Sequence, residues 1–199
     1  MDICRKVYVL ALLLTVQSSI VVFGAHAFNN KLNTCLPTKS YINNYEPAVF
    51  NTTNNLLRLY DQTKNVHGKE ILLIGTVVDQ GCNPVPSAKI FMWQKDIYGK
   101  YPYQTLRPQA NKMIYIDKNS AFIGSGTAIS NNVGAFTFIT LLPGTTIKND
   151  KAHINLRIEI QNDVALQTKI AIRDMEIIDF DTQQELPVYQ FRIVIPQPK

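Results

Sequence analysis

The sequence predicts an all-β protein, an antiparallel β-sandwich preceded by an N-terminal arm that contains one short helix. From Glu70 onward, short stretches rich in β-branched and aliphatic residues follow one another at brief intervals. Glycine, proline, asparagine and aspartate separate these stretches, as they do at turns. Some stretches also alternate between apolar and polar residues, which is the period of a strand with one buried face. Many short strands with frequent turn signals and little helix are typical of a sandwich.

The strands themselves can be located from these patterns. Ala152–Ile160 alternates most clearly, because its odd-numbered positions are polar and its even-numbered positions are aliphatic. A polar face of this kind is typical of a strand that faces water in an antiparallel sheet. The predicted strands are Glu70–Val78, Ala88–Gln94, Lys112–Ile116, Phe122–Thr127, Gly134–Leu141, Ala152–Ile160, Leu166–Ile172 and Val188–Ile195.

The 199 residues are expected to form one globular domain with additions at the N-terminus. We assign residues 1–27 to a signal peptide, residues 28–67 to the arm and residues 68–199 to the sandwich. The arm is rich in Asn, Thr, Tyr and Leu, and its short helix is expected around Thr53–Asp61.

The first 27 residues have the three parts of a secretory signal. Arg5 and Lys6 precede the apolar stretch Val7–Phe23, and Ala25–Ala27 offers a small-x-small cleavage site. Cleavage there predicts a periplasmic or secreted bacterial protein with no membrane span. The alternative is an uncleaved anchor, although Gln17–Ser19 interrupts the apolar stretch and the stretch is short for a span.

Cys4 lies in the predicted signal, so the mature chain keeps Cys35 and Cys82. An even pair in an oxidising compartment predicts a disulfide that ties the arm to the turn after the first strand. The alternative is two inert thiols. The net charge is +5 for the whole chain and +4 without residues 1–27. These charges are spread out, and no nucleic-acid-binding motif accompanies them, so nucleic acid is not an expected partner.

The stretch Gly68–Tyr101 combines two strands, a turn and a loop that ends in a tyrosine. Together with later motifs it resembles the intradiol ring-cleavage dioxygenases, a family that includes the catechol and protocatechuate enzymes. The resemblance covers about Gly68–Gln167. It rests on the spacing of Trp93 and Tyr101, on Gly134-Ala135-Phe136, on Pro143-Gly144, and on Ala152-His153-Ile154-Asn155.

The resemblance implies an iron site built from two tyrosinates and two imidazoles, ligands that suit a hard ferric ion. Tyr101 and His153 stand at two of the four ligand positions. Thr146 stands where the family has its second tyrosine, and Asn155 where it has its second histidine. Asp150 replaces an arginine that the family places before the first histidine.

Two of the four ligands are therefore lost, and we expect no ring-cleaving activity and no bound iron. A threonine hydroxyl does not ionise as a phenol does, and an asparagine amide is a weak neutral ligand. The alternative is a ferric intradiol dioxygenase in which Tyr98, Tyr103 or Tyr115 supplies an oxygen ligand. Aromatic residues near the site are expected to serve packing, or else to line its mouth: Phe91, Trp93, Tyr98, Tyr101 and Tyr103.

The functional prediction is an exported, non-catalytic binding or structural module of the cell envelope, such as a subunit of an envelope or secretion complex. It is expected to bind an envelope protein or itself, with an aromatic small molecule as a further ligand class. The alternatives are the ferric enzyme, and a plain prealbumin-like or carboxypeptidase-regulatory-like sandwich. Those last families share a Gly-x-Val-x-Asp pattern followed by Pro-Val-x-x-Ala-x-Ile, but they lack iron.

Overall fold

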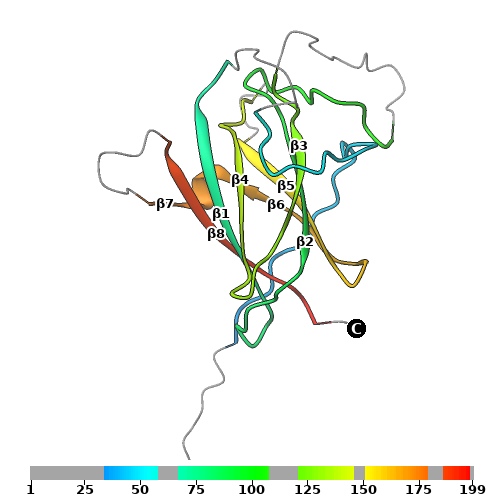
Figure 1. Cartoon of the computed structure of the whole chain (residues 1–199), viewed down its shortest axis with the longest axis vertical. Helices are drawn as coiled ribbons and strands as arrows, with labels where there is room; N and C mark the ends of the chain where they lie inside the picture. The colour runs from blue at the N-terminus through cyan, green and yellow to red at the C-terminus, as the bar shows by residue number, and fades with distance from the viewer. Residues whose placement is uncertain (1–33, 58–66, 108–120, 146–150, 179–185, 198–199) are drawn as a thin grey trace, which may run out of the picture. The chain divides into compact units, whose positions relative to one another are not determined.

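A computed structural model describes residues 34–57, 67–107, 121–145, 151–178 and 186–197. They contain eight strands, which are labelled in Figure 1, and one short 3-10 helix. The elements are β1 (Glu70–Val78), β2 (Lys89–Gln94), β3 (Ser125–Ile129), β4 (Ala135–Leu141), β5 (His153–Ile160), β6 (Asp163–Ala171), η1 (Ile172–Asp174), β7 (Glu176–Ile178) and β8 (Val188–Val194).

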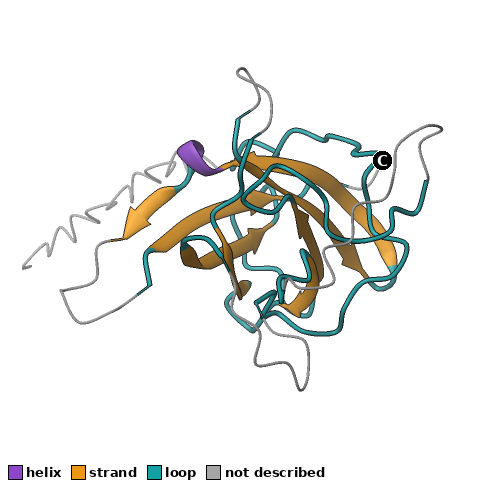
Figure 2. Cartoon of the chain, turned by 90° about the horizontal axis from the view of Figure 1, so that it is seen from above, coloured by secondary structure: helices purple, strands orange, loops and turns teal. Residues whose placement is uncertain are grey.

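The strands form two four-stranded sheets, one in the order β4-β1-β8-β7 and the other in the order β3-β2-β5-β6. All neighbours are antiparallel except β1 and β8, which run parallel. Figure 2 shows the strands from above, with loops around them. The predicted β-sandwich is therefore confirmed, with one parallel pair in an otherwise antiparallel arrangement.

The core lies between the sheets and follows from the two-residue period of the strands. In β5 the even-numbered residues Ile154, Leu156 and Ile158 are fully buried. They pack in one cluster with the apolar faces of the other strands. Burial of such aliphatic side chains stabilises a fold by roughly 1.5–3 kcal/mol each, which makes this cluster the main source of stability.

The N-terminal arm crosses from one edge of the sandwich to the other. The N–H of Thr38 donates to Val194 O of β8, and the N–H of Tyr41 donates to Gln167 O of β6. Further along, the arm reaches β3 and β4, where the N–H of Leu56 donates to Ile139 O. Residues 53–57 contain no helix, so the predicted helix is absent from the described part of its range, and residues 58–61 lie outside the description. The carbonyls and amides that a helix would pair internally instead bond to edge strands.

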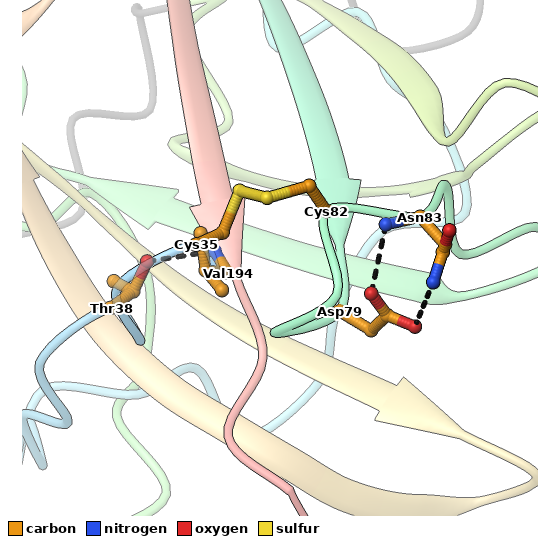
Figure 3. The surroundings of a disulfide bond; sticks show 6 residues. All are labelled: Cys35, Thr38, Asp79, Cys82, Asn83 and Val194. Atoms are coloured by element: carbon orange, nitrogen blue, oxygen red, sulfur yellow. Dashed lines mark hydrogen bonds between the residues drawn. A yellow bond between two sulfur atoms is a disulfide. The ribbon is translucent and has the colours of Figure 1, made fainter. Parts of the chain in front are cut away.

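The predicted disulfide is confirmed. Cys35 and Cys82 are bonded, with their Cα atoms 5.3 Å apart, and the N–H of Cys35 donates to Gln80 O. Cys82 lies in the turn between β1 and β2, where Asp79 accepts hydrogen bonds from the N–H and the amide of Asn83 (Figure 3). These two bonds hold the pKa of Asp79 below its usual value. The bridge therefore joins the start of the described arm to an ordered turn.

Three strand predictions need correction. The strand expected at Leu166–Ile172 is β6, which already begins at Asp163 because Asp163 and Val164 pair with the end of β5. The strand expected at Phe122–Thr127 begins only at Ser125, because Gly124 has φ +67°, a left-handed conformation that breaks a strand. The strand β7 was missed, because its three residues are too short to show alternation and are ordered by pairing with β8. The strand expected at Lys112–Ile116 lies outside the described residues.

No helix in the described segments is long and apolar enough to cross a membrane.

Candidate functional site

Tyr101 is presented by the loop that follows β2, and Asp96 holds that loop in shape. The Asp96 carboxylate oxygen Oδ1 accepts the N–H groups of Tyr98 and Lys100 at 2.9 and 2.8 Å. The main chain closes the same turn, since Asp96 N–H donates to Lys100 O at 2.7 Å. Gly99, with φ +72°, allows the reversal of direction. The local sequence thus fixes the main-chain position from which the Tyr101 side chain extends.

The Pro143–Gly144 turn packs on this loop. Gly144 N–H donates to Asp96 O at 2.9 Å, and a Cβ atom at Gly144 would lie only 1.9 Å from Ile97 O. Only glycine allows so close an approach of two main chains. Thr146 and Asp150, which follow this turn, lie outside the described residues, as does Tyr115.

Three tyrosines gather where the arm meets the Tyr101 loop. The rings of Tyr45 and Tyr101 are stacked with centroids 4.8 Å apart, and the ring of Tyr103 lies 5.7 Å from that of Tyr101. The Tyr103 hydroxyl donates to Tyr45 O at 3.2 Å. Burial raises the pKa of Tyr103 well above its usual range, and the neighbouring Tyr101 and Glu46 act in the same direction. Tyr103 is therefore a neutral hydrogen-bond donor at physiological pH.

The centre of the site is a network of two amides and one phenol. Asn155 is fully buried and Asn43 nearly so, with 9% of its surface exposed. Asn43 Nδ2 donates to Asn155 Oδ1 at 2.6 Å and to the Tyr101 hydroxyl at 3.3 Å. Asn155 Nδ2 donates to Trp93 O at 3.2 Å and to the same hydroxyl at 3.5 Å. Asn43 Oδ1 accepts the N–H of Tyr45 at 2.6 Å.

Every amide group in this network has a protein partner, which is what burial demands of polar atoms. The Tyr101 oxygen accepts two long hydrogen bonds from N–H donors, at 3.3 and 3.5 Å. A side chain from the arm, Asn43, supplies one of those donors and also binds Asn155. The arm therefore completes the network, although nothing in its sequence marks Asn43 as part of a site.

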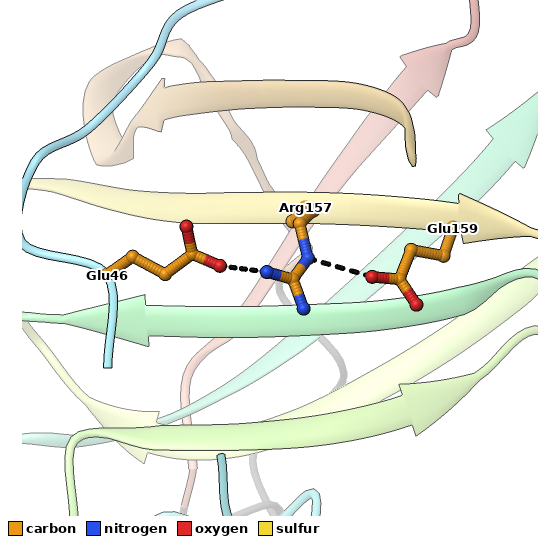
Figure 4. A network of polar contacts seen from close by, with 3 residues as sticks. All are labelled: Glu46, Arg157 and Glu159. Carbon is orange, nitrogen blue, oxygen red and sulfur yellow. Dashed lines mark hydrogen bonds and ion pairs between the residues drawn. The ribbon is translucent and has the colours of Figure 1, made fainter. Parts of the chain in front are cut away.

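The polar face of β5 continues at Arg157, which binds two carboxylates (Figure 4). Its guanidinium pairs with Glu46 of the arm, and its Nε lies 3.1 Å from Glu159. The guanidinium carbon lies 4.2 Å from the centroid of the Phe91 ring and 5.3 Å from that of Phe50. These contacts clamp the arm onto the outer face of the sheet.

The surface interpretation of this polar face is therefore wrong. The side chains of Arg157 and Glu46 are only 20% and 15% exposed, and Asn155 is fully buried. The period of two correctly placed these residues on one face, but the arm covers that face. Burial of ionic and amide groups is tolerated because the arm brings the partners that satisfy them.

His153, on the same face of β5 as Asn155, begins the strand and is partly buried. Its Nδ1 lies 2.7 Å from Lys151 O, and because a carbonyl can only accept, Nδ1 donates this bond. The ring is thus oriented by the main chain just before the strand. Among the described residues at the ligand positions that the resemblance implies, Tyr101 and Asn155 are in direct contact through a hydrogen bond.

These residues do not fit the four-ligand iron site that the resemblance implies. Asn155 offers a neutral amide where the resemblance implies an imidazole, and the oxygen of that amide already accepts a 2.6 Å hydrogen bond from Asn43. Within the residues described, no group of three or more His, Cys, Asp or Glu side chains could hold a metal ion.

The aromatic residues near the site are packed in the interior, as the packing interpretation predicts, with the exception of Tyr98. Trp93 is fully buried and contacts Phe50 edge-on at 5.8 Å, and Phe91 is 7% exposed. Tyr98, by contrast, is 58% exposed. Tyr98 therefore lies at the rim and the others lie beneath the arm.

Comparison with known proteins agrees with this architecture. The protein-family model described as Dioxygenase matches residues 41–168. A protein of Rickettsia conorii that carries the provisional name of a dioxygenase is 38% identical over 186 residues, which cover 87% of this chain and 89% of the relative. The protocatechuate 3,4-dioxygenase beta chain of Burkholderia cepacia is 30% identical over 91 residues, which cover 43% of this chain and 36% of that one.

Solved structures show the same fold at lower identity. An intradiol ring-cleavage dioxygenase from Tetranychus urticae matches with a TM-score of 0.64 at 19% identity, covering 81% of this chain and 95% of that chain. The dioxygenase domain of a carbohydrate-binding fusion protein from Streptomyces sp. SirexAA-E matches with a TM-score of 0.58 at 18% identity, covering 81% and 99%. The resemblance inferred from sequence motifs is thus confirmed, and the chain belongs to the intradiol ring-cleavage dioxygenase family.

Proposed function

We propose that this protein is a non-catalytic member of its family, exported to the cell envelope, where it acts as a binding or structural module without iron. One observation carries the proposal. At the position of the family's second histidine, Asn155 is buried in a closed network with Asn43 and Tyr101.

The chemistry of that network argues against a catalytic ferric site. The amide of Asn155 is neutral, and its oxygen already accepts a 2.6 Å hydrogen bond. Ferric iron prefers anionic oxygen ligands and imidazoles, and catalytic metal sites commonly use three or more protein ligands. Freeing Asn155 and Tyr101 for a metal would remove both acceptors of the buried Asn43 Nδ2 group, and an unpaired buried donor costs about 1–3 kcal/mol.

Export is proposed from the N-terminal signal pattern and supported by the disulfide. Residues 1–27 combine a charged start, an apolar stretch and a cleavage site, and the Cys35–Cys82 bridge suits an oxidising compartment. Mass spectrometry of the protein purified from its cell envelope should give a mature chain that starts at Phe28 and is lighter by two hydrogen atoms than the chain with both cysteines reduced. A full-length chain with free thiols would contradict this part of the proposal.

The decisive test of the non-catalytic role is the metal content and visible spectrum of the mature chain, before and after ferric iron is offered. We expect a colourless protein with less than a tenth of an equivalent of iron. The alternative function, a ferric intradiol dioxygenase, is favoured by the retained Tyr101 and His153. Stoichiometric iron with a tyrosinate-to-iron band that disappears in Tyr101→Phe and in His153→Ala would establish that alternative.

The binding role is tested separately. Chemical cross-linking in intact cells, followed by purification of the protein, should recover a defined envelope protein or a dimer of this chain. A protein that remains a monomer by light scattering and yields no cross-linked product would contradict it.

A further inference from the structure

The edge of the sandwich formed by β3 and β4 carries a groove with a volume of about 930 Å³. β3 is the last strand of one sheet and β4 the last strand of the other, so the groove opens between the two sheets. Amide and hydroxyl side chains make up most of its polar lining, with one cation and no carboxylate. They are Asn51, Thr52, Thr53, Asn54, Thr127, Asn131, Thr137 and Lys89.

The arm already binds this edge, and its residues Asn51–Asn54 line part of the groove. Thr127 N–H of β3 donates to Thr53 O at 2.9 Å, and Ile139 N–H of β4 donates to Asn54 O at 3.0 Å. The N–H of Leu56 then donates to Ile139 O at 2.8 Å. Within this chain, an extended segment is thus held by the outward main-chain groups of both edge strands.

The edge of β3 continues past the arm into the groove. At the two ends of β3, Ser130 N–H donates to Ala88 O, and Gly124 O accepts the N–H of Gln94. The main-chain N–H and C=O groups of the even-numbered residues along β3 therefore point toward β2. The main-chain groups of the odd-numbered residues therefore point away from β2, as the N–H of Thr127 does when it donates to Thr53 O. Two residues further along, Ile129 directs its N–H and C=O away from β2, toward the groove that it lines.

The side chains beside this edge suit a second extended segment. Ile129 is 70% exposed and Val133, in the following turn, is 62% exposed. The floor of the groove includes Phe136 and Ile123, which are 4% and 8% exposed. An edge strand with exposed apolar side chains and outward main-chain groups is a template for strand addition.

We propose that this groove binds an extended segment of a partner protein, which adds to the edge of β3 beyond the point where the arm leaves it. The main chain of the segment pairs with Ile129, and an acidic side chain of the segment faces Lys89. The groove continues an interface that the arm already forms with the same edges, and its lining carries positive charge only. The proposal deepens the binding role proposed above by naming the class of partner.

Selection from a phage-displayed library of random twelve-residue peptides provides the test, with the mature disulfide-bonded chain as the target. We expect enriched peptides that lack proline and carry Asp or Glu. Synthetic copies, measured by fluorescence anisotropy, should bind Ile129→Pro at least tenfold more weakly, because proline removes the outward N–H. Since that N–H faces away from β2, the substitution removes no hydrogen bond between β3 and β2.

Matched variants separate the groove from general effects. Ile129→Val keeps the main-chain donor and should bind like the wild type, while Lys89→Glu should weaken acidic peptides at least threefold. Lys69→Glu makes the same charge change at an exposed position outside the groove and should have no effect. Unfolding curves of all four variants verify that each is folded.

A selection without enrichment, or peptides that bind Ile129→Pro as tightly as the wild type, would overturn the proposal. A dimer of this chain that Ile129→Pro dissociates would also overturn it, because the groove would then belong to a second copy. The outcome is independent of iron: a ferric protein that still binds peptides here would refute the non-catalytic role and leave the groove proposal standing.

Discussion

Asn43 and Asn155 are 112 residues apart in sequence, yet Asn43 Nδ2 lies 2.6 Å from Asn155 Oδ1 in the interior of the protein. This pair joins the N-terminal arm to β5 and also holds the hydroxyl of Tyr101. It places a closed hydrogen-bond network at a position to which the sequence resemblance assigns a metal ligand.

The energetic coupling of this pair can be measured by a double-mutant cycle in urea. Asn43→Ala and Asn155→Ala should each lower the free energy of unfolding by about 2 kcal/mol, because each leaves the other amide buried without its partner. The double variant should lose less than the sum, with a coupling of at least about 0.5 kcal/mol. Asn132→Ala, at an exposed asparagine, serves as the control and should change stability by less than about 0.5 kcal/mol. Fully additive losses would show that the pair is not a unit.

Placing at position 155 the histidine that the resemblance implies should not create an iron site. Asn155→His is expected to stay colourless and free of iron after ferric loading, because Asn43 and the Tyr101 hydroxyl occupy the surroundings of that side chain. The imidazole is also larger than the amide it replaces in a fully buried position, so the variant should be less stable than the wild type. Metal analysis and the visible spectrum decide the point. A tyrosinate-to-iron band in this single variant would contradict the account.

Arg157 should be the main ionic anchor of the arm. Arg157→Met keeps much of the apolar contact with Phe91 but leaves Glu46 partly buried and unpaired, so stability should fall by about 3 kcal/mol. Limited proteolysis should then cleave the arm near Glu46 faster than in the wild type. Arg173→Met removes an arginine that is 62% exposed and pairs with Asp174, and it should cost less than about 0.5 kcal/mol. Equal effects of the two substitutions would show that the clamp adds little.

The disulfide should contribute to stability through the loop that it closes. Cys35 and Cys82 are 47 residues apart, and a loop of this length restricts the unfolded chain by roughly 4 kcal/mol in the chain-entropy model. Reduction should therefore lower the melting temperature by about 10 °C. The Cys35→Ser/Cys82→Ser variant should melt at the reduced temperature and show no response to reductant. A wild type that melts identically with and without reductant would disprove the contribution.

Tyr103 should give the protein a specific alkaline limit. Its folded-state pKa is raised, mainly by burial, so the folded chain holds the phenol proton more tightly than the unfolded chain. The resulting stability is fully present below the unfolded pKa of about 10 and is lost as pH rises through the folded value. Tyr103→Phe should therefore show a shallower loss of stability above pH 10, together with the loss of the hydrogen bond to Tyr45 O.

The control for the alkaline limit is Tyr98→Phe, which removes the hydroxyl of a ring that is 58% exposed. Unfolding in urea at several pH values between about 8 and 11.5 compares the three proteins. A Tyr103→Phe curve parallel to that of the wild type would contradict the prediction.

Some of this architecture was already determined by the order of the residues. The two-residue period of Ala152–Ile160 placed His153, Asn155, Arg157 and Glu159 on one face, because successive side chains of any strand point to opposite sides. Cys35 and Cys82 form an even pair outside the predicted signal, and that pair predicted the disulfide that the structure shows. The spacing of Trp93 and Tyr101 and the Pro143–Gly144 turn identified the family, because they are local features that a short stretch of chain carries by itself.

The tertiary structure decided what lies against that polar face. A period of two tells which side chains share a face, but it does not tell whether water or another segment covers it. Here the arm covers it, and the partners Asn43 and Glu46 come from more than a hundred residues away. Pairing of β7 with β8 and the left-handed turn at Gly124 are likewise set by contacts distant in sequence or by backbone geometry. The sequence by itself thus determined most of the described strands, the disulfide and the family. Only the folded chain, by bringing distant polar groups into contact, placed Asn155 in a buried amide network.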